Sequence, residues 1–600
     1  MKKLLVIAMC LLVASMAFAQ AKIDLKGTIY NQFRWTDGTA MMGAHTENPW
    51  NGSRSDYTKG NFMRSEVEFE VNATISKYVK AYLRVKTIWD GDDGNSSVEA
   101  NSAAWETYWD ANTGWFKLRG FRIDLMPDLS FVDQIQLGTP MGLGFSKWFM
   151  ADRRYIDRDN AKGIYIKGNA GKAKWNLVRL WQANWQGWNW GTGDFHAEDG
   201  TWAANINGDI MEGHHIALDG FWFADTEFDP TDPENPNYSV GNDDPNGMME
   251  TKEMYQNIGF GLSGKWDVSD AVNIDYNVMY TGSIVDDSLD VDDDNIIDGY
   301  GGWEPVPQYA KVWAPSGVLT VSGTDPFEVG FSPRFQFFYI NHNYTSFWGS
   351  RREDDMLLIE GGIDAIRNTY GERLGLNAFM WDSDQNAVRH EFRDNENLRL
   401  GEDLVESPVG YWGATLDLKQ DMDLMTIKGQ FNYLGRTDNT GGDTDEEDDL
   451  YDGSGTMYMP AHDFTGMVAD LELSGNVSDW DWKLNVDYGN WADDYDKDTG
   501  VDDVACTAMK VMPTIGRQLS RTIGMEIYPA YQMVTDEVDG ETTFEYNQIV
   551  IGHKWVYNFG GFDFWLRGEH KIYSPDDQDS TTEDYKLASN TLHAAFEVKF

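Results

Sequence analysis

Apolar and polar residues alternate with a period of two along much of this chain. The clearest example is the segment 62–89, where valine, phenylalanine and leucine alternate with glutamate, lysine and arginine. The last ten residues repeat the pattern, with Phe596, Val598 and Phe600 on the apolar side. Because successive side chains of a strand point to opposite faces, each such segment has one apolar and one polar face. The pattern predicts an all-β protein.

The connections between the expected strands differ in length in a regular way. Short turns alternate with long segments rich in Asp, Gly and Asn, which is typical of a barrel that crosses a membrane. A soluble β-sandwich, the alternative, gives no reason to gather long loops at one end. The short turns are expected at Ser76–Tyr78, Asn169–Lys172, Asp267–Asp270, Lys419–Asp423, Gly475–Asp479 and Asn558–Gly561. We expect the long acidic loops at 90–114, 183–200, 224–255, 282–315, 382–408, 436–461 and 491–503.

We therefore predict a transmembrane antiparallel β-barrel with long acidic outer loops and short periplasmic turns. About 18 strands are expected, and the pattern fits any even number from 16 to 24. The weakest strand candidates are the segments 132–138, 316–322 and 504–513.

Residues 1–19 have the features of a secretory signal peptide. Lys2 and Lys3 precede the apolar core Leu4–Ala14, and Ala17-Phe18-Ala19 supplies small residues before a cut. The predicted domain organisation is a signal peptide at 1–19 and a single barrel domain at 20–600. Loss of the two lysines with the signal changes the formal net charge from −50 to −52. One cysteine, Cys506, remains after the cut, so no disulfide can form within the mature chain.

Composition agrees with a barrel and disfavours several other classes. The mean hydropathy of −0.51 suits a barrel, because only alternate strand residues meet lipid. Girdles at the two membrane interfaces would use the 25 Trp, 30 Phe and 28 Tyr residues. The strongly acidic balance argues against binding nucleic acid. We see no phosphate-binding loop and no nucleophile–base pair, so an enzyme is not expected.

Taken together, the signal peptide, the charged hairpin at 62–89, the Gly-rich stretch Leu137–Lys162 and the terminal Phe600 resemble bacterial outer-membrane porins, of the general or alginate-export-like kind. The resemblance implies passive diffusion of small hydrophilic solutes or ions across a Gram-negative outer membrane. It also implies contact with lipid and lipopolysaccharide, and allows a homotrimer. In this family the last strand closes the barrel, so Phe596, Val598 and Phe600 would form a signal for the barrel-assembly machinery.

The resemblance also places a pore constriction. The third loop of porins often folds into the lumen and carries opposed charges, and the segment Gly138–Asp159 has glycines and such charges. An ordinary outer loop with solvated charges is the alternative. The candidate constriction residues are Lys147, Asp152, Arg153, Arg154, Asp157, Arg158, Arg84, Arg64 and Glu66.

Charge distribution gives an expectation for selectivity. Residues 61–190 hold 17 Lys and Arg against 15 Asp and Glu, a net charge of +2, which leaves −54 for the rest of the mature chain. Lumen arginines act at short range, whereas carboxylates in outer loops are screened beyond a Debye length of about 8 Å. We expect a nearly unselective or mildly anion-preferring channel.

Two acidic loops resemble calcium-binding turns, in which alternate carboxylates converge on a hard cation. Both lack the glutamate at position 12 of a full calcium loop, and solvated acidic loops are the alternative. No cofactor is required by this interpretation, although calcium in the outer loops is a candidate. The candidate ligands are Asp290, Asp292, Asp294 and Asp298 in one loop, and Asp494, Asp496, Asp498 and Asp502 in the other.

Two other functions fit parts of the pattern. A non-conducting surface barrel would use the acidic loops as an adhesin or as a scaffold for divalent cations. A secreted carbohydrate-binding β-protein would use a track of tryptophans at Trp181, Trp185, Trp188 and Trp190, which otherwise mark a membrane interface.

Overall fold

The structure is a computed structural model. It describes residues 22–36, 62–92, 117–139, 142–150, 161–182, 200–225, 255–285, 313–341, 344, 346, 411–437, 462–495, 504–575 and 588–600. Within these ranges, no helix is long and apolar enough to cross a membrane.

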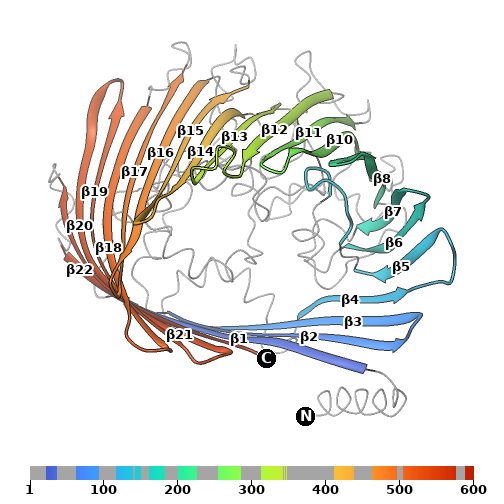
Figure 1. The fold of residues 1–600 in the computed structure, drawn as a ribbon, viewed down its shortest axis with the longest axis horizontal. Helices are drawn as coiled ribbons and strands as arrows, with labels where there is room; N and C mark the ends of the chain where they lie inside the picture. Colours follow the sequence, from blue (N-terminus) through green and yellow to red (C-terminus); the bar gives the residue numbers. More distant parts are fainter. Residues whose placement is uncertain are drawn as a thin grey trace, which may run out of the picture.

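The described chain consists of 22 strands in a single sheet (Figure 1). They are β1 (Lys22–Thr36), β2 (Phe62–Ser76), β3 (Val79–Asp92), β4 (Lys117–Leu125), β5 (Val132–Gly138), β6 (Ala161–Ala170), β7 (Ala173–Gln182), β8 (Gly200–Met211), β9 (His214–Asp225), β10 (Tyr255–Ser269), β11 (Val272–Val285), β12 (Trp313–Gly323), β13 (Phe331–Ile340), β14 (Tyr411–Asp421), β15 (Met425–Arg436), β16 (His462–Val477), β17 (Trp480–Tyr495), β18 (Val504–Gln518), β19 (Ile523–Val538), β20 (Glu541–Asn558), β21 (Phe562–Pro575) and β22 (Ala588–Lys599).

Each strand pairs antiparallel with its neighbours in sequence, and β22 pairs with β1, so the sheet closes into a barrel. In the closing pair, Ile29 lies opposite Val598 and Phe33 opposite Ala594. Closure removes the unpaired edges that an open sheet exposes. The prediction of an all-β antiparallel barrel is confirmed.

The strand number is 22, not about 18, although it lies within the expected range of 16 to 24. The three segments with the weakest patterns are all true strands, namely β5, β12 and β18, each paired on both sides. The pattern of β12 is weak because its inward residues Ala314 and Val318 are buried and apolar, while Leu319 is exposed on the outside. The other inward residues, Ser316, Thr320 and Ser322, are small and uncharged, so the lumen face contrasts little with the outward face.

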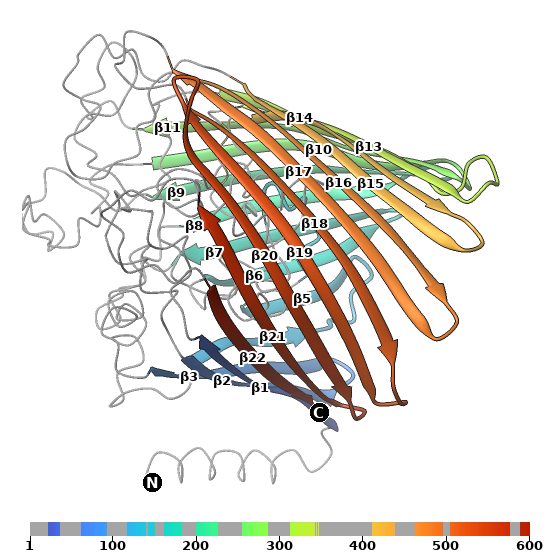
Figure 2. The same cartoon turned by 90° about the vertical axis from the view of Figure 1, so that its left-hand side faces the viewer.

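Short turns lie at one end of the barrel and the longer connections at the other (Figure 2). The six predicted short turns are confirmed, between β2 and β3, β6 and β7, β10 and β11, β14 and β15, β16 and β17, and β20 and β21. An exception at the long-loop end is Asp539–Gly540, a two-residue hairpin connection between β19 and β20. Both residues there have positive φ, at 50° and 75°, as a tight hairpin turn requires.

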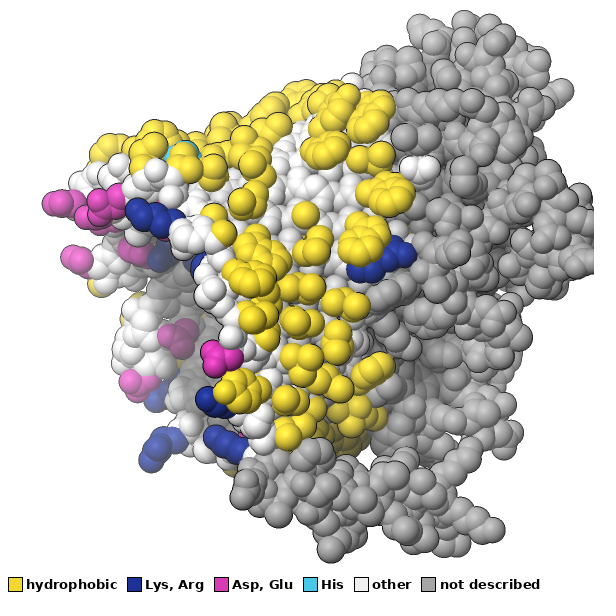
Figure 3. Space-filling view, turned by 90° about the vertical axis from the view of Figure 1, so that its right-hand side faces the viewer, with side chains coloured by type: hydrophobic (Ala, Val, Ile, Leu, Met, Phe, Trp, Pro, Cys, Tyr) yellow, Lys and Arg dark blue, Asp and Glu magenta, His cyan; other side chains and the backbone are white. Residues whose placement is uncertain are grey.

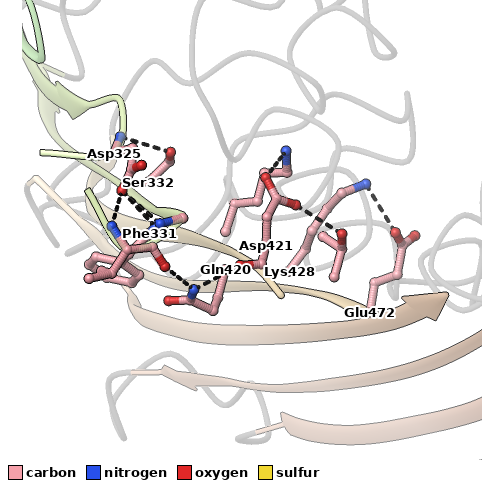
Figure 4. A network of polar contacts seen from close by, with 11 residues as sticks. Asp325, Phe331, Ser332, Gln420, Asp421, Lys428 and Glu472 are labelled. Atoms are coloured by element: carbon pink, nitrogen blue, oxygen red, sulfur yellow. Dashed lines mark hydrogen bonds and ion pairs between the residues drawn. The ribbon is translucent and has the colours of Figure 1, made fainter. Parts of the chain in front are cut away.

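Two turns of the short end are bound to each other by polar contacts (Figure 4). The Asp325 carboxylate accepts the backbone N–H groups of Val329 at 2.7 Å, Gly330 at 2.8 Å and Phe331 at 3.2 Å, and so shapes the β12–β13 turn. Gln420 of β14 then donates to the Val329 carbonyl at 2.7 Å. These bonds hold the turn although Asp325 itself has a positive φ of 43°.

The outer wall of the barrel carries a band of hydrophobic side chains, and charged side chains gather toward the turn end (Figure 3). Phe260, Val278 and Ile551 are examples that are more than half exposed, at 58%, 57% and 54%. Residues next to them along the strand point into the barrel, as the period of two requires. The outward face is therefore apolar and the polar positions face the lumen.

Candidate pore constriction

The inward side chains change character along the height of the barrel. On β13 they run from Arg334 near the turn, through Gln336, to Phe338 and Ile340 at the loop end, and the last two have no exposed surface. Apolar inward residues that are this buried must be covered by other parts of the chain. Neighbouring strands repeat the apolar inner layer, with Leu180, Phe223, Met279, Val318, Tyr411 and Leu434.

A covering segment is the stretch 142–150, which follows β5 and lies inside the ring of strands (Figure 1). The Phe149 ring packs on Phe221 of β9, with ring centroids 5.5 Å apart. Phe149 also lies against Gly261 of β10, where an added Cβ would come within 2.0 Å of the ring. Any larger residue at that position would displace Phe149, so the glycine allows the segment to lie flat on the wall.

A chain of buried polar groups ties this segment to the wall. The Tyr165 hydroxyl lies 2.8 Å from the Leu143 carbonyl and 3.0 Å from Asn176 Oδ1. Asn176 donates to Asn205 Oδ1 at 3.1 Å, and Asn205 donates to Asp219 Oδ1 at 2.6 Å. The Asp219 carboxylate in turn accepts the backbone N–H of Ser146. Hydrogen bonds between buried polar groups favour a single arrangement of the segment on the wall.

The beginning of the β13–β14 connection holds the same segment from the other side. The Tyr344 hydroxyl donates to the Trp148 carbonyl at 2.7 Å, and Ser346 Oγ donates to the Phe149 carbonyl at 3.0 Å. The Trp148 and Tyr344 rings meet edge to face, with centroids 6.2 Å apart. We call residues 142–150 together with Tyr344 and Ser346 the inner lobe.

The predicted constriction residues are placed as follows. Lys147 lies in the inner lobe and is exposed. Arg84 of β3 makes a two-pronged ion pair with Glu68 of β2, at 2.8 and 3.1 Å. Arg64 and Glu66 belong to β2, where they lie opposite Gln32 and Tyr30 of β1, but their side chains are outside the described part. Asp152, Arg153, Arg154, Asp157 and Arg158 are also outside the described residues.

Lumen cations of several strands are paired with carboxylates. Lys510 of β18 contacts Asp487 of β17 at 2.8 Å, and Arg122 contacts Asp124 within β4 at 2.7 Å. Similar pairs are Arg334 with Asp417, Lys428 and Lys483 with Glu472, and Arg567 with Glu569. A paired cation produces a weaker field at a distance than an isolated one. The positive electrostatic field that these arginines and lysines produce in the lumen is therefore weaker than that of the same number of unpaired cations.

The calcium candidates lie almost entirely outside the described residues. The backbone of Asp494 is described and lies opposite Asp463 in the β16–β17 pair, but its side chain is outside the described part. Among the described residues, no group of three or more His, Cys, Asp or Glu side chains could hold a metal ion. The tryptophan track after Trp181 is outside the described part too.

The predicted closing strand is β22, which pairs with β1 and so closes the barrel. The Gly27 N–H donates to the Phe600 carbonyl at 2.9 Å, and the Phe600 N–H donates to the Gly27 carbonyl at 3.1 Å. The Phe600 ring lies over Gly27 and meets Phe69 edge to face, with centroids 6.0 Å apart. Val598 and Phe596 lie two and four residues before Phe600, on the same face of the strand. Recognition of these residues during assembly stays a prediction.

Tyr344 and Ser346 were not among the residues predicted from the sequence. A usable signal lies just before them, because the segment Phe335–Ile340 is apolar at every position except Gln336. A strand that is apolar on both faces needs cover on the lumen side as well as outside. This pattern indicates that the nearby connection folds inward.

No family model and no curated protein matches the chain. Among solved structures it is similar to the P pilus usher PapC translocation pore, with 8% identity, a TM-score of 0.37 and coverage of 96% of this chain and 99% of that one. It is also similar to OccK11 (OpdR) of Pseudomonas aeruginosa, with 7% identity, a TM-score of 0.35 and coverage of 96% of each chain. The FrpB iron transporter from Neisseria meningitidis matches with 8% identity, a TM-score of 0.43 and coverage of 96% of this chain and 82% of that one.

Proposed function

We propose that this protein is a channel of the Gram-negative outer membrane through which small hydrophilic solutes or ions diffuse passively. On this proposal residues 1–19 direct secretion and are removed. The observation that carries the proposal is the closed 22-stranded sheet with an apolar outer face and a lumen face that bears polar and charged groups. Such a sheet satisfies all strand hydrogen bonds without water, as a spanning structure must.

The exposed apolar band argues for lipid around the barrel. Exposure of a large apolar side chain to water instead of an apolar medium costs about 1.5–3 kcal/mol. Many outward Phe, Ile, Leu and Val side chains share this cost, and they gather in a band on the face drawn in Figure 3. Contiguous apolar surfaces of this extent mark membranes or partners. A partner would cover one side, whereas outward apolar residues occur on strands all around the barrel.

The charged groups on the lumen wall favour polar solutes and weak selectivity between cations and anions. Its described ion pairs place both signs of charge on the wall at close spacing. An ion inside meets attraction and repulsion within a few ångströms, so neither sign is strongly excluded. We propose weak selectivity and a preference for hydrated, uncharged or small ionic solutes.

Single-channel recording tests the proposal. The full mature chain, refolded into detergent and added to a planar lipid bilayer, is expected to give discrete current steps. The current steps should appear only with folded protein, and a shift in gel migration after heating identifies the folded form. Folded protein that inserts but never conducts would reject the proposal.

That result would favour a non-conducting surface barrel. The specific observation in favour of this second function is the inner lobe, which covers part of the loop end of the lumen. A barrel whose lobe and other loops fill the lumen completely would present its outer loops to the surroundings and pass nothing.

A further inference from the structure

The inner lobe is anchored on two sides by different parts of the chain. Wall groups hold its first half, where Asp219 accepts the Ser146 N–H and Ser146 Oγ lies 3.3 Å from Asn277 Oδ1. Two hydroxyls hold its second half, where Tyr344 and Ser346 bind the carbonyls of Trp148 and Phe149. These hydroxyls come from 196 and 197 residues further along the chain.

The second set of anchors is buried and specific. Trp148, Phe149, Tyr344 and Ser346 are 5%, 2%, 6% and 3% exposed. A buried backbone carbonyl needs a hydrogen-bond donor, and a hydroxyl supplies one without adding charge. In the described part of the chain, these two hydroxyls are the side-chain donors that reach the Trp148 and Phe149 carbonyls.

Lys147 lies between the two sets of anchors. Its neighbours Ser146 and Trp148 are each held, so the backbone position of this exposed cation is set from both directions. Loss of the hydroxyls would leave the wall anchors and the Phe149–Phe221 contact in place, but it would remove the hydrogen bonds to the Trp148 and Phe149 carbonyls and so loosen the second half of the segment.

We propose that Tyr344 and Ser346 are positioning residues for the constriction, so that two loops far apart in sequence jointly set the width of the passage. This inference rests on the proposed function and names the residues that control it. Without the hydroxyls the lobe has a second, looser arrangement. The passage is then wider for part of the time, and Lys147 no longer acts on permeating ions from a fixed place.

The test compares Tyr344→Phe, Ser346→Ala and the double variant with the unmodified protein in planar bilayers. Each lost hydroxyl is expected to raise the fraction of time in a higher-conductance state by about 2- to 12-fold, which corresponds to one net hydrogen bond. The matched control is Tyr280→Phe, because this outward tyrosine is 45% exposed and stacks on Trp313. It is expected to conduct like the unmodified protein. Ser346→Thr keeps the hydroxyl and is expected to restore the unmodified current pattern.

A second measurement does not depend on conduction. In a Cys506→Ser background, Met150→Cys places a thiol at a position that is 1% exposed in the inner lobe. Its labelling by a charged thiol reagent is expected to speed up when Tyr344→Phe and Ser346→Ala are added, and to stay unchanged with Tyr280→Phe.

The outcomes separate the two ideas. If no form conducts but labelling accelerates, the channel function fails and the positioning role stands. If the unmodified protein conducts, but the double variant matches the Tyr280→Phe control in both current and labelling, the positioning role is overturned.

Discussion

Replacement of Phe600 by alanine should weaken the closed barrel only slightly but should strongly reduce assembly in cells. The two backbone hydrogen bonds between Phe600 and Gly27 do not need the ring, so they survive the substitution. What is lost is the contact of the ring with Gly27 and Phe69. The ring is 50% exposed, so only about half of its surface is involved.

The loss can be estimated from the buried area. A fully buried Phe covers about 150–250 Å², and half of that at about 25 cal/mol per Å² gives roughly 2–3 kcal/mol. This is an upper value, because lipid tails can replace the lost protein contact. The closing pair retains its ladder from Thr28 to Thr36, so the seam should remain intact.

Gly27→Ala tests the ring contact without removing the ring. The new Cβ would lie 2.4 Å from Phe600 Cζ and 2.9 Å from the Glu68 carbonyl oxygen, so both the ring and the neighbouring β2 backbone must shift. Gly429→Ala is the matched control, because its nearest neighbour would be 3.7 Å away, an ordinary contact. If Phe600 is a recognition signal, Phe600→Ala should fail in cells while Gly27→Ala assembles.

Two measurements separate stability from recognition. Denaturant unfolding of protein refolded into lipid vesicles should show a small loss for Phe600→Ala and a loss at least as large for Gly27→Ala, whose Cβ also meets the Glu68 backbone. The amount of heat-modifiable folded protein in the outer membrane should fall several-fold for Phe600→Ala alone. Equal amounts of folded Phe600→Ala and unmodified protein in cells would refute the recognition argument, and a loss far above 3 kcal/mol in vesicles would refute the area estimate.

Four further predictions follow from single features. Asp325→Ala should lower the free energy of unfolding by about 1–3 kcal/mol, because three backbone N–H groups lose their acceptor, and denaturant unfolding measures this. Lys510→Met should cost about 1–3 kcal/mol, because it leaves the partly buried Asp487 carboxylate without its cation, and adding Asp487→Leu should recover most of the loss. Reversal potentials in a salt gradient should be small, and strong cation selectivity that persists in high salt would contradict this. Millimolar calcium should protect the loops at Asp290–Asp298 and Asp494–Asp502 from protease relative to chelator, and equal cleavage would count against calcium binding there.

Much of the architecture could be predicted because a barrel has a simple local rule. Alternation identifies strands, and the contrast of short turns with long acidic segments identifies the two ends. The rule works best where the lumen face is charged, as on β2 and β3, since charge and apolar residues then separate cleanly. The strand number was harder, because strands such as β12 have small or apolar residues on the lumen face and lose the contrast.

The arrangement of the candidate site could be predicted only in part. The sequence placed the segment after β5 as the inward loop by resemblance, and residues 142–150 do lie within the ring of strands. It did not reveal that Arg84 pairs with Glu68, because Glu70 lies directly opposite Arg84 and the ion pair is made to the diagonal neighbour instead.

The second anchor of the inner lobe is hidden in the sequence for a related reason. Tyr344 and Ser346 are ordinary residues whose importance comes from carbonyls nearly 200 positions away. The sequence does show why such residues are needed. Where the inward residues of a strand turn from charged to apolar, as between Arg334 and Ile340, the lumen there cannot be filled with water alone. A connection must fold back to cover those side chains, and its backbone then needs partners that the sheet does not provide. A barrel whose lumen face turns apolar toward its loop end therefore implies both an internal lobe and side chains that satisfy the lobe's buried backbone groups.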